Sequence, residues 1–162
     1  MLDPDMNVFP NNVVLRIAAA LDGIDETVTV FKRALKATDP DLSIGVFPAA
    51  WLPQQESLEI GHGFVGEPTL QEYQIGVQSF IKHSDREIGL ALHSVLANRV
   101  RTVLYRNAAL RLSLESLSVV DGDYQERFMR SKIRNQRYMN NEISGKFVYL
   151  SVLDYSLETE IR

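Results

Sequence analysis

The residues of this chain that could carry out chemistry are three histidines and three pairs of nearby carboxylates. No histidine has a second histidine or a carboxylate at the spacing by which a helix presents metal ligands, so each is interpreted as a surface or packing residue. Acid–base catalysis needs a carboxylate held in a pocket, whereas aspartate in short pairs is typical of caps and turns. The residues concerned are His62, His83, His93, Asp25–Glu26, Asp39/Asp41 and Asp121/Asp123.

One glycine-rich segment has the spacing of a dinucleotide-binding loop. Residues 61–66 read GHGFVG, which matches G-x-G-x-x-G. That loop binds phosphate because a helix begins directly after it, but here Pro68 and a predicted strand follow.

The chain has no cysteine, which excludes disulfides, thiolate nucleophiles and zinc–thiolate sites. The sequence therefore predicts no catalytic residue, no metal site and no cofactor, and we expect a protein that is not an enzyme.

The charge changes sign along the chain. Residues 1–72 carry 11 acids and 4 bases, residues 73–140 carry 6 acids and 11 bases, and residues 141–162 have a net charge of −2. An acidic and a basic region can meet within one fold or between copies, where charge complementarity sets register and partner choice. The centre of the basic region has no acid between its members, which are Arg127, Arg130, Lys132, Arg134 and Arg137.

This basic segment has three possible interpretations. Arginine beside aromatic residues such as Tyr124, Phe128 and Tyr138 can bind single-stranded nucleic acid through phosphate contacts and base stacking. The segment could instead be a solvated strand face, or a seam between protein subunits, where arginine and tyrosine are enriched. As a strand, 124–143 would place Arg127, Met129, Ser131, Ile133 and Asn135 on one face, whereas a helix would place Phe128, Lys132 and Asn135 together. Asn140-Asn141 and Gly145 are typical of a hairpin turn and favour a strand or an extended arm.

The sequence predicts two amphipathic helices. Beginning at an Asn11 or Asn12 N-cap, apolar residues recur at spacings of 3 and 4 up to Leu35, which indicates a helix of about seven turns that Gly23 could divide. Ser84-Asp85-Arg86-Glu87 reads as a capping box that opens a second helix ending near Asn107. Its predicted buried face contains Ile88, Leu92, Val95, Leu96, Val100, Val103 and Leu104.

Strands are predicted between and after the helices. The alternation of 72–82 is the clearest, with Tyr73, Ile75, Val77, Ser79 and Ile81 on one face. Strand 147–157 is expected to be central in the sheet, because its middle is apolar on both faces. The expected strands are 42–52, 57–61, 72–82, 110–120, 124–143 and the central strand 147–157, with turns at Asp121-Gly122 and Ser144-Gly145. The sum is an α+β fold with a mainly antiparallel sheet and two principal helices packed on one face.

Length and composition predict one domain. The 162 residues fit an N-terminal arm, 1–11, and a single α+β domain, 12–162. No stretch reaches the roughly 18 apolar residues that a membrane span needs, and no signal peptide is expected.

The expected elements follow a recognisable order along the chain. A long N-terminal helix precedes a strand ending in FPAAWLP at 47–53. The YQIGVQSFIK strand, 73–82, runs directly into the SDREIGLALHSVLANRV helix, 84–100, and GKFVYLSVLDYSLETE, 145–160, is the last segment. In this order and in length, the chain resembles the tail terminator (tail completion, tail-to-head joining) proteins of long-tailed phages. The resemblance covers most of residues 12–160, and the family has no invariant motif from which a site residue could be carried over.

The resemblance implies an α+β subunit that forms a ring, typically a hexamer. The ring would cap the tail tube, stop its polymerisation and contact the neck, at the tail–neck junction of a virion assembled in the host cytoplasm. The implied partners are further copies of the chain, the tail tube protein and a neck or connector protein. We hypothesise that Arg127, Arg130, Lys132, Arg134 and Arg137 lie at a subunit seam, at the tube face, or in the lumen where DNA passes. The alternatives are another neck or connector protein and a small nucleic-acid-binding module.

Overall fold

The computed structural model describes residues 8–53 and 69–162. The expected strand at 57–61 and the glycine-rich segment 61–66, with His62, lie outside the described residues. The elements are α1 (Phe9–Asp22), β1 (Thr29–Phe31), β2 (Leu42–Pro53), β3 (Thr69–His83), α3 (Arg86–Arg106), α4 (Ala108–Glu115), β4 (Ser118–Asp121), β5 (Tyr124–Ile143) and β6 (Lys146–Ile161).

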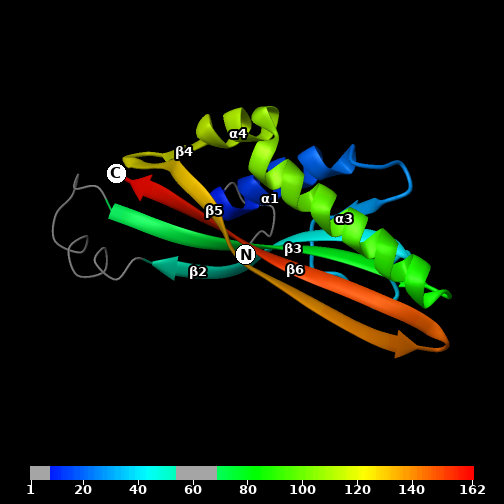
Figure 1. Ribbon diagram of the computed structural model, residues 1–162. Helices are drawn as coiled ribbons and strands as arrows, with labels where there is room; N and C mark the ends of the chain where they lie inside the picture. The colour runs from blue at the N-terminus through cyan, green and yellow to red at the C-terminus, as the bar shows by residue number, and fades with distance from the viewer. Residues whose placement is uncertain (1–7, 54–68) are drawn as a thin grey trace.

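Within the described residues, the strands form one six-stranded sheet in the order β1-β2-β3-β6-β5-β4 (Figure 1). The pairs β2–β3, β3–β6, β5–β6 and β4–β5 are antiparallel. Strand β1 runs parallel to β2, because residues 32–41 return the chain to the end of the sheet at which β1 begins. The α+β class is therefore confirmed, but the sheet is mixed rather than mainly antiparallel.

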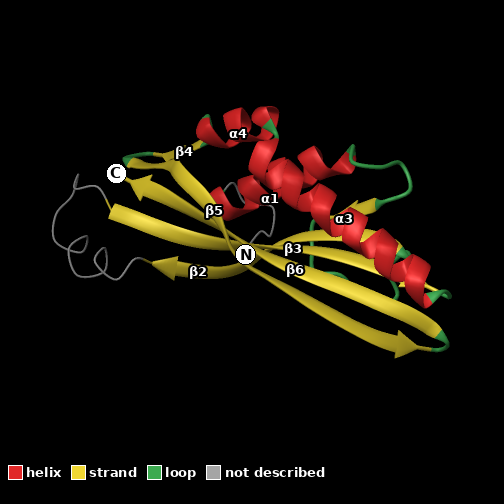
Figure 2. Cartoon of the chain, viewed as in Figure 1, coloured by secondary structure: helices red, strands yellow, loops and turns green. Residues whose placement is uncertain are grey.

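The helices α1, α3 and α4 lie together on one face of the sheet (Figure 2). The layer thus contains three helices in the described residues, not two. The predicted face of β3 is confirmed, since its alternating residues from Tyr73 to Ile81 are all buried. The largest buried apolar side chains come from both layers and include Phe9, Ile17, Leu21, Ile44, Ile75, Ile81, Leu153 and Leu157.

Helix α1 is shorter than the sequence pattern predicts. It begins at Phe9 after the N-cap Val8, with Pro10 in its first turn, and it ends at Asp22. Asp25 Oδ1 then accepts hydrogen bonds from the Thr27 backbone N–H at 2.9 Å and from its hydroxyl at 2.7 Å, which closes a turn before β1. The β-branched residues that follow favour a strand, so the expected helix up to Leu35 is wrong beyond Gly23.

Helix α3 forms where it is expected but begins and faces differently. Asp85, not Ser84, is the N-cap, and its side chain accepts a hydrogen bond from the Ile88 N–H at 2.9 Å. The predicted face is wrong in its first half, because Ile88, Leu92 and Val95 are 51%, 40% and 51% exposed. The buried residues are Gly89, His93, Leu96, Ala97, Val100 and Leu104.

The predicted strand 110–120 is mostly a helix. Asn107 caps α4, and its side chain accepts a hydrogen bond from the Leu110 N–H at 2.9 Å. Leu110 and Leu114 lie one turn apart and are both buried, whereas Leu112 between them is exposed. The strand β4 is confined to the last residues of the predicted range, and the turn that follows has Gly122 at φ 59°.

The predicted C-terminal hairpin is confirmed. Strands β5 and β6 pair from Glu126–Ile161 to Ile143–Lys146, and the turn between them has Ser144 at φ 52° and Gly145 at φ 75°. Strand β6 is central, as expected, because it lies between β3 and β5. The long strand β5 is the next strand outward, and it carries the basic segment.

Candidate functional site

The basic segment lies on β5, and four of its five side chains pair with acids of their own chain. Arg127 lies 3.0 Å from Glu160, Arg130 lies 3.0 Å from Glu158, and Arg137 lies 3.8 Å from Asp154. Arg134 pairs with Glu72 on β3. Lys132 makes no ion pair within residues 8–53 and 69–162. One of these four acids, Glu72, belongs to the acidic region 1–72, and the other three lie on β6.

Two β-bulges bring the basic side chains to one face. The register with β6 shifts between Phe128 and Arg130, and again between Ile133 and Asn135. Each extra residue reverses the alternation that follows. Strict alternation predicted that Arg127, Ser131 and Ile133 would share a face, and this is wrong.

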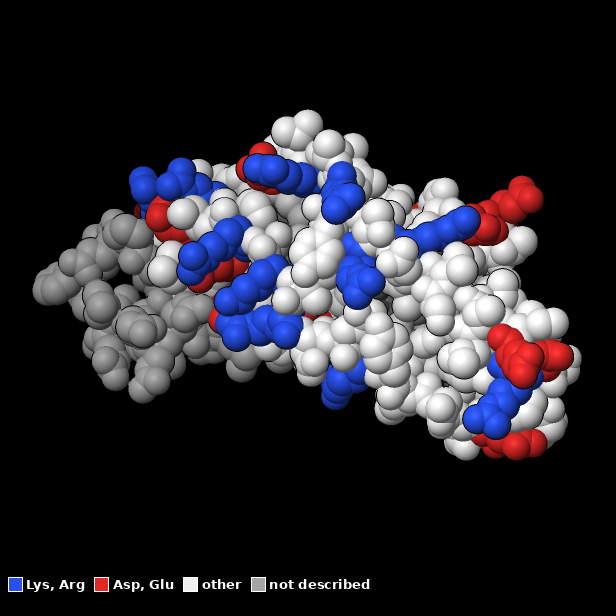
Figure 3. Space-filling view, viewed as in Figure 1, with Lys and Arg blue, Asp and Glu red and all other residues white. Residues whose placement is uncertain are grey.

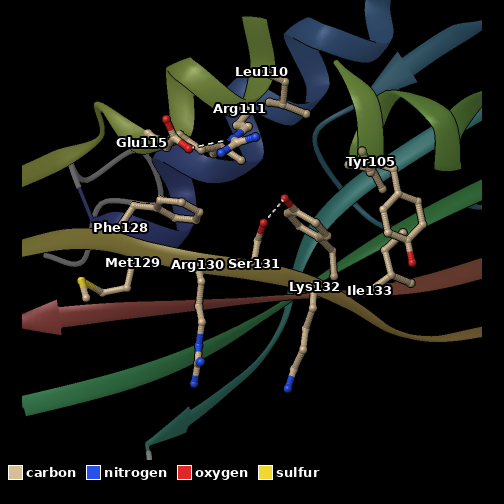
Figure 4. A pocket seen from close by; sticks show the side chains of 13 residues that line it. Tyr105, Leu110, Arg111, Glu115, Phe128, Met129, Arg130, Ser131, Lys132 and Ile133 are labelled. Atoms are coloured by element: carbon tan, nitrogen blue, oxygen red, sulfur yellow. Dashed lines mark hydrogen bonds and ion pairs between the residues drawn. The ribbon is translucent and has the colours of Figure 1, made fainter. Parts of the chain in front are cut away.

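Figure 4 shows the arrangement after the first bulge: Arg130 and Lys132 point away from the helices, whereas Phe128 and Ser131 point toward them. On the helix side, Tyr155 of β6 donates a hydrogen bond from its hydroxyl to Ser131 Oγ at 2.7 Å. Burial raises the pKa of Tyr155, so this hydroxyl keeps its proton at neutral pH. Lys and Arg gather over β5 and the nearby helices in the space-filling view (Figure 3).

The arginine side chains of these ion pairs are 43–75% exposed. Hydrogen bonding from Arg162, with the charge of Arg127 nearby, holds the pKa of Glu160 below its usual value. Exposed pairs of this kind contribute only about 0–1 kcal/mol each. The ion pairs balance the charges of the four arginines within the sheet. Lys132, which has no ion pair in the described residues, is therefore the cation of the basic segment that is available to a partner.

Strand β5 has a long edge without a strand partner in the described part of the chain. Strand β4 covers that edge only from Tyr124 to Arg127, and the Phe128 N–H reaches the Leu117 carbonyl at 3.4 Å. From Met129 to Ile143 the edge is open. Its exposed large side chains are Met129, Tyr138, Met139 and Ile143. An open edge of this length is a template for pairing with another chain.

A cleft of about 290 Å³ lies beside the first part of this edge. Its walls are α3 and α4 on one side and residues 128–133 of β5 on the other, as Figure 4 shows. The ion pair between Arg111 and Glu115, 2.8 Å long, lies at the α4 side. The apolar lining consists of Leu104, Leu110, Leu114, Phe128 and Ile133, with Tyr105 and Tyr155.

A buried carboxylate anchors the beginning of β5. Glu126 is 2% exposed and accepts hydrogen bonds from three hydroxyls: Tyr73 at 2.6 Å, Tyr124 at 2.7 Å and Thr159 at 2.6 Å. Burial, with the hydrogen bond to Glu126, raises the pKa of both tyrosines. Sequence reasoning missed this cluster, because Glu126 lies between Gln125 and Arg127 and reads there as one more surface charge.

The other chemical candidates have structural roles. His93 is buried against Tyr149 and Tyr138, with ring centroids 5.8 and 6.0 Å away, which confirms a packing histidine. His83 Nδ1 accepts a hydrogen bond from the Asp85 N–H at 2.9 Å. Asp39 binds Arg33 at 2.7 Å, and this contact lowers the pKa of Asp39 to about 2.

Among residues 8–53 and 69–162, no three His, Cys, Asp or Glu side chains lie close enough together to hold a metal ion. None of the helices described is both long and apolar enough to cross a membrane.

Comparison with solved structures gives distant likenesses in fold. No protein-family model matches the sequence, and no curated protein matches it. A solved structure described as "Virion of native gene transfer agent (GTA) particle" contains a chain that matches with a TM-score of 0.44 and 9% identity. The match covers 90% of this chain and 91% of that chain.

Proposed function

We propose that this chain is a structural protein of a virion that assembles with copies of itself into a ring, closes the tail tube and joins tail to head. The proposal starts from the resemblance to tail terminators. It is supported by the order of described elements: β2 contains FPAAWLP, β3 leads within three residues into α3, and β6 closes the chain. In this proposal the protein acts by assembly and has no catalytic role.

The observation that carries the proposal is the open edge of β5. A heterologous interface closes a ring when one surface of each subunit meets a different surface of the next. The stretch Met129–Ile143 offers unpaired backbone groups together with exposed methionine, tyrosine and arginine side chains, which are enriched at protein interfaces. We propose this edge as one half of the subunit seam.

The charges of the basic segment have a smaller part in this proposal than the sequence suggested. Arginines already paired with their own Glu158, Glu160 or Glu72 gain little from a second acid in a neighbour. Lys132 has no such partner in the described residues, so it would contribute most to partner choice. The tube protein, a neck or connector protein and DNA in the lumen remain proposed partners of the assembled ring.

Charge reversal at the seam tests the proposal. We expect the double variant Lys132→Glu with Arg137→Glu to need at least a tenfold higher protein concentration than the wild type to form oligomers. Light scattering measures this. Arg137 is chosen because its own ion pair, 3.8 Å long, is the longest of the four. The matched control is Lys32→Glu with Lys36→Glu, which gives the same net charge on exposed positions near β1.

Equal assembly of both double variants would contradict the seam on β5. A second outcome would favour a nucleic-acid-binding module instead: a protein that stays monomeric, binds single-stranded oligonucleotide, and loses that affinity steeply as salt rises. A ring held by β5 backbone pairing should instead keep its mass as salt rises.

A further inference from the structure

Helix α3 has an exposed apolar stripe on one flank. Ile88, Leu92 and Val95 are each at least 40% exposed. Their spacings of four and three residues place them on the same flank of the helix. Arg99 continues the stripe by one more turn and lies 3.4 Å from Asp25, which precedes β1. The stripe therefore faces the β1 end of the sheet.

The opposite flank of α3 faces β5. Leu90 lines a hollow together with Asn140 and Asn141 of β5, and Tyr105 lines the cleft beside residues 128–133. Because α3 packs on the central strands β3 and β6, its two flanks face opposite ends of the sheet (Figure 1). The stripe and the cleft are therefore different surfaces on opposite sides of the subunit, which suits the two halves of a heterologous ring seam.

The stripe has the spacing and length that the cleft can accept. An apolar helix face docks in a groove through residues such as i, i+4 and i+7, which is the spacing of Ile88, Leu92 and Val95. Seven helical steps span about 10 Å, and the five steps of β5 from 128 to 133 span about 17 Å. The cleft is therefore long enough for the stripe, and its apolar lining, which includes Phe128, would cover the stripe.

The charges beside the stripe and beside the cleft are opposite in sign. Residues 22–28, which include the Asp25 contact of Arg99, contain three acids and no base. Glu26 among them is exposed and makes no ion pair within residues 8–53 and 69–162. On the other side, the cation without an ion pair in that part of the chain is Lys132, which lines the cleft. Complementary charges of this kind set register and partner choice, so they favour a second copy as the occupant.

We propose that the α3 stripe of one copy docks in the cleft beside β5 of the next copy, with residues 22–28 facing Lys132. The inference rests on the proposed self-assembly and names the surface that meets the β5 side of the seam. Each copy offers one stripe and one cleft, so the same contact repeats from copy to copy until the ring closes.

Two variants with complementary defects test this contact in the full chain. The stripe variant combines Leu92→Asp with Val95→Asp. The cleft variant combines Tyr105→Asp with Met129→Asp, both of which line the cleft. All four side chains are exposed in the single chain, so neither variant places a charge in the core.

A matched control makes the same charge change elsewhere. It combines Leu112→Asp with Val120→Asp, which are exposed apolar residues outside the stripe and the cleft. We expect the stripe variant and the cleft variant each to need at least a tenfold higher protein concentration than the control to form oligomers. Light scattering measures this.

Mixing the stripe variant with the cleft variant shows whether the two surfaces meet. The cleft variant keeps an intact stripe and the stripe variant keeps an intact cleft, so one contact can form and association stops at one copy of each. Native mass spectrometry of an equal mixture should show a heterodimer of two chains of about 18.3 kDa, at least tenfold more abundant than either homodimer.

Each of the other outcomes contradicts the contact in a distinguishable way. A stripe variant that assembles as well as the control would overturn the α3 contact and leave self-assembly standing. Two defective variants that form no heterodimer would show that the stripe and the cleft do not meet. A wild type that stays monomeric, alone and with tail tubes, would contradict the contact and the proposed function together. If circular dichroism shows that a double variant is unfolded, Ile88→Asp or Tyr105→Asp alone replaces it.

Discussion

Replacing Thr159 by valine tests whether the buried carboxylate of Glu126 stabilises the beginning of β5. The Thr159 hydroxyl donates to Glu126 Oε1 at 2.6 Å, and the side chain is fully buried. Valine keeps the shape but removes the donor, while the carboxylate stays buried with the hydroxyls of Tyr73 and Tyr124. The perturbation therefore isolates one hydrogen bond to a charged acceptor.

The expected loss of stability can be worked out from this one hydrogen bond. A hydrogen bond to a charged group contributes about 1.5–3 kcal/mol to stability. Replacing a hydroxyl by a buried methyl returns about 0.8 kcal/mol at most. We therefore expect T159V to lower the free energy of unfolding by about 1–2 kcal/mol.

Urea denaturation measures the difference, with T27V as the matched control. The Thr27 hydroxyl also donates to a carboxylate, Asp25, at 2.7 Å, but in an exposed turn, so its loss should cost less than about 0.5 kcal/mol. In an E126Q background the cost of T159V should fall to about 0–0.7 kcal/mol, because a hydrogen bond between neutral groups contributes about 0.5–1.5 kcal/mol and the methyl group again returns about 0.8 kcal/mol. Equal losses of stability for T159V and T27V would refute the reasoning. So would a T159V loss that is the same in the wild type and in the E126Q background.

Two further predictions concern the core and the sheet. Burial lowers the pKa of His93, so its neutral form is favoured in the folded state; this stability is present above the unfolded pKa of about 6.5 and is lost as pH falls below it. The free energy of unfolding should therefore fall between pH 7 and pH 5 more in the wild type than in H93F, and parallel curves would contradict this. A Cβ on Gly76 would lie 2.5 Å from Phe47 Cζ, so G76A should cost about 1–3 kcal/mol, whereas G23A, with nothing within 4 Å of its Cβ, should not destabilise the protein. Denaturation midpoints compare the two glycine variants.

The elements that sequence patterns predicted well are those with a single possible period. Strand β3 alternates cleanly, and its Tyr73–Ile81 face is buried as expected. Around α4 the pattern is ambiguous, because Leu110, Leu112 and Leu114 alternate as in a strand, while Leu110 and Leu114 also lie one helical turn apart. The Asn107 cap and packing on the sheet favoured the helix.

The errors in α1 and α3 have a tertiary cause. Val28 and Leu35 continue the helical spacing of α1, but the segment between them supplies β1, whose backbone pairs with β2. In α3 the buried face contains Gly89 and His93 in place of larger apolar residues, because β6 approaches closely there: a Cβ on Gly89 would lie 2.9 Å from the Tyr149 ring. Helix spacing alone does not reveal which face docks.

For the candidate site, the sequence identified the basic segment but not its surroundings. The pairing of Arg130 with Glu158, and of Arg134 with Glu72, depends on strand order and on two bulges. Neither feature has a local sequence signal here. The cleft depends on the packing of α4 beside β5, so it could not be predicted while α4 was expected to be a strand.

The most direct test of the central claim is the mass of the protein in solution, measured by light scattering, with negative-stain images of the same sample, alone and with tail tubes. We predict closed rings with a central hole, and a mass that is a multiple of the 18.3 kDa chain. A protein that stays monomeric at every concentration, and that neither forms rings on tubes nor caps them, would contradict the claim.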